Sequence, residues 1–209
     1  MKNLKLNFMI KVSLLSVVAF MLMFLEFALP IFPTFLQIDI SDMPAIIGTF
    51  ALGPAAGVAI ELFKNILHIL FKGTSTMFIG EVANFVVGAI LVITIGLLYN
   101  RNKSKKTAII SLVVGTIVMS VSAALLNWIV FIPLYGKFMG YPISAFVGMG
   151  RAVNSHITNL FTFLVLSIIP FNLLKGTIVS LVTFPIYKSL SPILHKEGLE
   201  DAQKLSKES

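Results

Sequence analysis

The chain contains no cysteine, which excludes disulfide bonds, thiolate catalysis and cysteine-ligated metals. Charged side chains are also scarce. They make up 12% of the 209 residues, whereas a soluble domain carries about 25%. Because 57% of the residues are hydrophobic and the mean hydropathy is +0.95, the composition indicates an integral membrane protein.

Catalytic and nucleotide-binding motifs are absent as well. The sequence has no P-loop, so the chain cannot hydrolyse ATP itself. It has neither H-E-x-x-H nor G-x-S-x-G, and its three histidines (His68, His156 and His195) are scattered. No ring of acids or filter-like sequence indicates an ion channel. We therefore expect no enzyme, no metal and no bound cofactor.

Long apolar segments fill most of the sequence. A spanning helix takes about 20 apolar residues, so the chain can hold roughly six. We expect an all-α integral membrane protein, a six-transmembrane-helix bundle that forms a single membrane domain over residues 1–209, with a polar tail at 190–209. Pro30 and Pro33 end the first helix, Pro54 bends or interrupts the second and Pro170 kinks the last, because proline breaks the helical hydrogen-bond ladder. The expected helices cover residues 7–29, 42–58, 59–71, 78–99, 108–134 and 153–187.

The net charge of +7 raises the question of nucleic-acid binding. The basic residues, however, gather at segment ends, within residues 2–11, 101–106 and 188–207, and no basic patch is interleaved with aromatic residues. With the N-terminus in the cytoplasm, six spans place all three clusters on the cytoplasmic side, as the positive-inside rule requires. Five spans would put one cluster outside. We expect a multi-pass protein of the cell membrane with both termini cytoplasmic and no nucleic-acid partner.

Several polar residues interrupt the apolar segments, where hydrocarbon makes them costly. Glu61, Lys64, Asn65 and His68 share one helix face, because residues three and four apart are neighbours on a helix. One interpretation is an intrahelical Glu61–Lys64 ion pair that needs no ligand. The other is that this face contributes to a binding site, and Asn65 and His68 favour it.

Further polar residues lie in three later segments. Glu81 and Asn84 open the fourth helix, either as an acidic first turn that complements the helix dipole or as part of a ligand site. Asn127 either forms an interhelical hydrogen bond or holds a ligand. Asn172 and Lys175 follow Pro170, and no acid lies near Lys175 in the sequence. We therefore expect Lys175 to be an unpaired ammonium that contacts a ligand.

Together these residues resemble a known family. The segment F-L-Q-I-D-I-S-D-M-P at 35–44, the pair Gly53-Pro54, the segment E-L-F-K-N at 61–65 and the segment G-E-V-A-N at 80–84 are similar to those of the riboflavin-binding substrate subunit of energy-coupling factor transporters. The resemblance covers nearly the whole chain.

The resemblance implies six helices and a vitamin site toward the extracellular side. It maps flavin-contacting positions to Gln37, Asp39, Asn127, Asn172 and Lys175. It also implies partners in the lipid bilayer, namely a transmembrane coupling subunit and two ATPase subunits. Such subunits use small residues spaced by four on the first helix to meet the coupling subunit, whereas Ser13, Ser16 and Ala19 are spaced here by three.

The irregular segment at 31–42, which carries Gln37 and Asp39, is expected to act as a gate over the site, because irregular backbone at membrane depth lines cavities or packs on protein.

Two other functions remain open. One is a subunit of the same architecture that binds thiamin or a pterin. The other, from a different class, is a membrane-embedded enzyme or structural partner that uses the Glu61 face.

Overall fold

A computed structural model describes the backbone of residues 2–207 and the side chains of residues 5–189, and most of the chain is helical. The expected all-α architecture is confirmed. The expected tail at 190–209 lies outside the side chains described, although the backbone of the last helix continues to Lys207. The elements, where η marks a π-helix, are α1 (Lys2–Met23), β1 (Phe27–Ala28), β2 (Gln37–Ile38), α2 (Asp42–Leu52), α3 (Pro54–Lys72), α4 (Ile79–Tyr99), α5 (Lys105–Leu126), η1 (Asn127–Phe131), α6 (Ile132–Met139), α7 (Ile143–Val153), α8 (Leu160–Phe163), η2 (Leu164–Ile168) and α9 (Ile169–Lys207).

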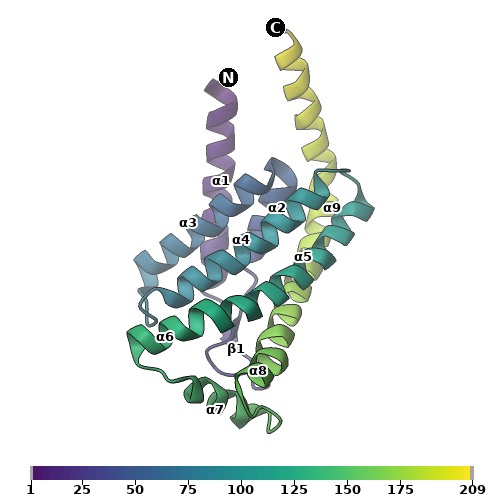
Figure 1. Cartoon of the computed structure of the whole chain (residues 1–209). Helices are drawn as coiled ribbons and strands as arrows, with labels where there is room; N and C mark the ends of the chain where they lie inside the picture. Colours follow the sequence, from purple (N-terminus) through teal and green to yellow (C-terminus); the bar gives the residue numbers. More distant parts are fainter. Residues whose placement is uncertain (1, 208–209) are drawn as a thin grey trace.

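The bundle consists of α1 to α5 together with α9 (Figure 1). Both ends of the chain, and the connection between α4 and α5, lie at one end of the bundle, at the top of Figure 1. The β1 strand and helices α6, α7 and α8 lie at the opposite end. The three basic clusters of the sequence therefore gather at a single end of the molecule.

Within the part of the chain that the structure describes, five helical segments are long and apolar enough to cross a membrane. The 11 residues of α2 extend only about 16 Å at 1.5 Å per residue, which is too short to cross a hydrocarbon core of about 30 Å alone. The five segments are Lys5–Met23, Pro54–Lys72, Ile79–Tyr99, Lys105–Met139 and Leu160–Ser189.

The break after α2 is set by two adjacent residues. Gly53 has a φ of 95°, in the region that favours glycine, and Pro54 begins α3. The expected interruption at Pro54 is thus confirmed. The boundary nevertheless lies at Gly53 rather than at residue 58, so α3 is longer and α2 shorter than expected.

Several other boundaries differ from expectation. The helix expected over 153–187 is interrupted, because residues 154–159 are not helical; α8 begins at Leu160, and α9 continues to Lys207. The first helix ends at Met23 rather than at residue 29, because Phe27 and Ala28 form an antiparallel strand pair with Ile38 and Gln37. The connection after residue 140 was expected to be a loop, yet α7 forms there. Phe146 and Gly150 are its buried residues, and they lie four apart on one face.

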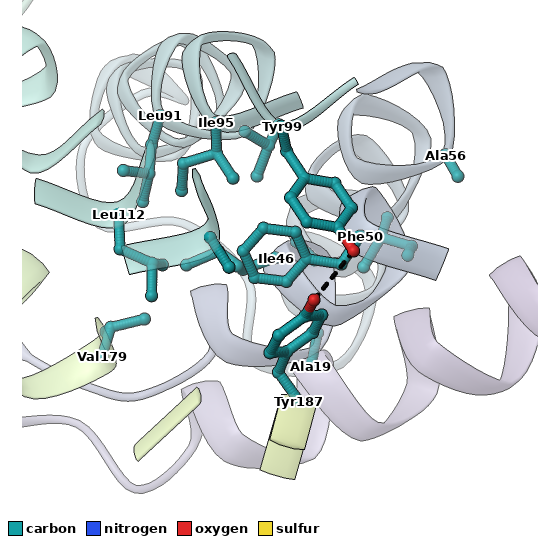
Figure 2. Close-up of a cluster of buried hydrophobic side chains, with 14 of the residues drawn as sticks. Ala19, Ile46, Phe50, Ala56, Leu91, Ile95, Tyr99, Leu112, Val179 and Tyr187 are labelled. Carbon is teal, nitrogen blue, oxygen red and sulfur yellow. Dashed lines mark hydrogen bonds between the residues drawn. The ribbon is translucent and has the colours of Figure 1, made fainter. Parts of the chain in front are cut away.

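Aromatic packing joins three helices at the end of the bundle where the termini lie (Figure 2). The Tyr99 and Tyr187 hydroxyls form a hydrogen bond of 2.8 Å, and the Phe50 ring packs against both phenol rings, with its centroid 4.7 Å from each. All three side chains are buried. This cluster holds α2, α4 and α9 together, away from the end that carries the polar residues of the candidate site.

Candidate functional site

The segment between α1 and α2 folds over the end of the bundle that is opposite the termini (Figure 1). The β1–β2 pair shapes it into a short hairpin. Phe32 is buried, and its ring meets the Phe171 ring of α9 edge-on at 5.4 Å. Phe35 packs against the Phe146 ring of α7 at 5.8 Å. Aromatic pairs of this kind add to the stability gained from burial, so the segment is held against both helices.

A buried ion pair fixes the same segment to α9. The Lys175 ammonium lies 2.9 Å from Asp39 Oδ2 and 3.5 Å from Asp42 Oδ2. All three residues are less than 9% exposed. The expectation that Lys175 is an unpaired ammonium is therefore wrong. Its acidic partners lie more than 130 residues earlier in the chain, so spacing along the sequence could not reveal them.

The charged network continues into α3. The Lys64 ammonium forms ion pairs with Asp42 and with Glu61, whose Oε2 atom lies 2.7 Å away, and it donates a hydrogen bond to Ser41 Oγ at 3.1 Å. Glu61 and Lys64 are fully buried. The expected intrahelical Glu61–Lys64 pair is confirmed, but it is one link in a network rather than an isolated pair. Since a buried charge is costly without a partner, the network strongly favours one arrangement of α2, α3, α9 and the hairpin.

Two cavities lie beneath the hairpin. The first has a volume of about 530 Å³ and the second about 170 Å³. They share the lining residues Phe35, Gln37, Gly80 and Asn84, so they adjoin one another. The first is polar along the ends of α1, α3 and α4, whereas the second carries more apolar residues from α5, η1 and α9. Other residues of the first cavity include Glu26, Asp39, His68, Lys72, Thr74, Thr76 and Glu81, and those of the second include Leu36, Val87, Met119, Asn127, Phe131, Tyr135, Phe171, Asn172 and Lys175.

The structure gathers most of the predicted site residues around these cavities. Gln37 and Asn84 line both, Asp39 lines the first, and a further three line the second, namely Asn127, Asn172 and Lys175. Glu61, Lys64 and Asn65 line neither cavity; their direct contact with a ligand stays a prediction. Asn65 Nδ2 instead donates to Glu61 O at 2.8 Å and to Asn84 Oδ1 at 3.3 Å. These contacts make the α3 face a support beneath the cavity wall.

Two asparagines of the second cavity have the same local geometry. Asn127 Nδ2 donates to Ala123 O at 2.9 Å, and Asn172 Nδ2 donates to Ile168 O at 2.8 Å. Within residues 5–189, no protein donor occupies either Oδ1 atom. Asn127 begins η1, and Asn172 follows η2 by one turn of α9. π-Helical turns inside α-helices occur frequently at functional sites, and here each one accompanies an amide with a free acceptor.

Several residues that line the first cavity were not predicted from the sequence as site residues. Glu26 forms an ion pair with Lys72, and in the amide orientation that satisfies both groups, Gln37 donates to the two Glu26 oxygens at 3.0 and 3.1 Å. Thr74 and Thr76 donate to Glu81 Oε2 at 3.0 and 2.9 Å. Glu26 could have been identified in the sequence as a candidate site residue, because it is a single acid at the end of a long apolar segment.

The expected small-residue face of the first helix points partly inward. Ser16 and Ala19 are 2% and 0% exposed, and Ser13 is exposed. Ser16 Oγ donates to Val12 O at 2.7 Å. Ser16 and Ala19 therefore pack within this chain, and a partner that approached α1 would meet other residues.

Comparisons with known proteins cover nearly the whole chain. A family model described as ECF transporter, substrate-specific component, matches residues 7–187. The riboflavin transporter RibU of Staphylococcus aureus is 36% identical over 188 residues, which are 90% of this chain and 92% of that protein. The riboflavin transporter FmnP of Bacillus subtilis is 33% identical over 195 residues, 93% of this chain and 97% of that protein.

A solved structure gives the same result. It is described as the S component of a bacterial ECF transporter, and it matches with a TM-score of 0.70 and 34% identity over 93% of this chain and 99% of that one. The region matched by the family model includes every residue that lines the two cavities.

Proposed function

Because this chain belongs to the substrate-specific components of energy-coupling factor (ECF) transporters, we propose that it captures riboflavin for ATP-driven uptake. It is a multi-pass membrane protein, and its role is to bind the vitamin rather than to change it chemically. The relatives named as riboflavin transporters favour riboflavin over thiamin or a pterin as the ligand.

The observation that carries this proposal is the pair of adjoining cavities with different linings. The second presents Asn127, Asn172 and Lys175 beside apolar and aromatic walls. Isoalloxazine has a pyrimidine edge of donors and acceptors on a flat apolar ring, which suits amides, an ammonium and aromatic walls. The first cavity supplies carboxylates, hydroxyls and amides, which suit the ribityl hydroxyls. The ring therefore occupies the second cavity and the ribityl chain extends past Gln37 and Asn84 into the first.

Membrane orientation follows from the basic clusters. All three lie at the end of the bundle opposite the cavities (Figure 1). The positive-inside rule places that end, with both termini, in the cytoplasm. The cavities then face outward, where the vitamin is collected.

The energy for uptake comes from partners, since the sequence has no nucleotide-binding motif. We assign to the complex a transmembrane coupling subunit and two ATPase subunits. The chain alone binds riboflavin, and the complete complex transports it.

Purification without partners tests both statements. The protein in detergent should bind riboflavin, appear yellow, and show quenching of its single tryptophan, Trp128, which is adjacent to Asn127. Proteoliposomes that hold this chain alone should not concentrate riboflavin, whereas those that also contain the coupling and ATPase subunits should do so with ATP. Colourless protein that binds thiamin, or concentrative uptake by the chain alone, would contradict the proposal.

A further inference from the structure

The first cavity contains one carboxylate without a basic partner. Of its three lining acids, Glu26 pairs with Lys72 and Asp39 pairs with Lys175. Glu81 forms no ion pair with any residue whose side chain the structure describes, and its Oε2 atom is satisfied by the Thr74 and Thr76 hydroxyls alone. Its negative charge therefore acts on whatever enters this cavity.

The position of Glu81 stabilises its negative charge. It lies in the first turn of α4, where the helix dipole and unpaired backbone N–H groups favour a negative group. Thr76 Oγ1 also accepts from Gly80 N at 3.0 Å. The Glu81 carboxylate already occupies the N-terminus of α4. An anion that entered the cavity would therefore be repelled there, rather than attracted as it would be by a free helix N-terminus.

The cavity still offers hydrogen bonds to an uncharged group. His68 is only 7% exposed and lines the cavity, yet neither of its ring nitrogens has a hydrogen-bond partner among the side chains and backbone of residues 5–189. An imidazole can donate from one nitrogen and accept at the other, and a hydroxyl can do both. The hydroxyl group of a ligand is therefore chemically suited to this buried ring.

From these contacts we propose that Glu81 makes the site selective for flavins with an uncharged ribityl chain, against flavins that carry a 5′-phosphate. The inference rests on the proposed function, in which the ribityl chain enters the first cavity. A phosphate at the end of that chain would bring like charge toward Glu81, and like-charge juxtaposition opposes binding.

Two substitutions of Glu81 separate the effect of its charge from the effect of its side-chain shape. Glu81→Gln removes the charge but keeps an oxygen that can accept from Thr74 or Thr76, and Glu81→Asp keeps the charge. Affinities for riboflavin, riboflavin 5′-phosphate and lumiflavin, which lacks the ribityl chain, are measured for each purified protein. In Glu81→Gln the preference for riboflavin over its 5′-phosphate should fall by about tenfold or more. In Glu81→Asp the preference should persist, and lumiflavin affinity should change in neither variant.

An unchanged preference in a Glu81→Gln protein that binds riboflavin would overturn this inference and leave the proposed function intact. Failure of the wild-type protein to bind riboflavin would overturn both. A ligand series keeps the test independent of the variants: wild-type protein should bind an uncharged 5′-ester of riboflavin at least about tenfold more tightly than the 5′-phosphate. Equal rejection of the two would mean that size, rather than charge, excludes the phosphate.

Discussion

Replacing Lys175 by methionine tests whether one side chain both holds the fold and contacts the ligand. Methionine keeps an apolar stem of similar length but removes the ammonium that lies 2.9 Å from Asp39 and 3.5 Å from Asp42. Asp42 keeps its contact with Lys64, whereas Asp39 loses its basic partner and retains the backbone N–H of Ser41 at 2.7 Å. Removing one partner of a buried ion pair costs about 3–5 kcal/mol of folding stability.

The same substitution should weaken riboflavin binding. Loss of a hydrogen bond to a charged group costs about 1.5–3 kcal/mol, or roughly ten- to a hundredfold in affinity. Thermal unfolding in detergent measures the stability, and titration followed by Trp128 quenching measures the affinity. Lys137→Met provides a matched control, because Lys137 is exposed and contacts the Phe138 ring rather than an acid.

A double variant separates the two effects. Adding Asp39→Asn to Lys175→Met removes the buried anion left without a cation, so the double variant should unfold at a higher temperature than Lys175→Met alone. Riboflavin affinity should stay low in both. A Lys175→Met protein as stable as Lys137→Met would refute the structural role of the ion pair. Unchanged riboflavin affinity in a folded Lys175→Met protein would refute the ligand contact.

Three further changes probe other parts of the account. Asn127→Leu should lower riboflavin affinity while leaving thermal stability nearly unchanged; the opposite pattern in titration and unfolding would make Asn127 a structural residue only. Gly88→Ala should lower the unfolding temperature, because a methyl group there would overlap the buried Glu61 carboxylate; unaltered unfolding would show that the network can shift. A spin label at Thr34 should lose mobility when riboflavin is added, and equal mobility with and without ligand would make the hairpin a static lid.

The helical architecture could be predicted from sequence because its signals are local. Apolar length indicates spanning helices, and the Gly53–Pro54 pair marks a break wherever it occurs in a helix. The topology inferred from the basic clusters stays a prediction, because the counting assumes six spans and α2 is too short to cross a membrane alone. The end of the first helix at Met23 could not be obtained in this way. The residues after it are still mostly apolar, and their strand pairing depends on Gln37 and Ile38, which lie farther along the chain.

The sequence predicted several of the residues that form the candidate site, but not how those residues contact one another. Costly polar residues in apolar segments identified Asn84, Asn127 and Lys175, all of which line the cavities. The partners of Lys175 lie on the hairpin and at the start of α2, so only folding brings them together. The α3 residues Glu61 and Lys64 show the converse case. Their spacing correctly indicated one polar face, but that face turns into the bundle and supports the site from beneath.

Calorimetric titration of the purified chain, without partner subunits, with riboflavin, thiamin and a pterin determines which of these compounds the protein binds. We expect saturable binding of riboflavin with one ligand per chain, and no measurable binding of the other two at the same concentrations. Saturable binding of thiamin or the pterin, with none of riboflavin, would contradict the proposed function.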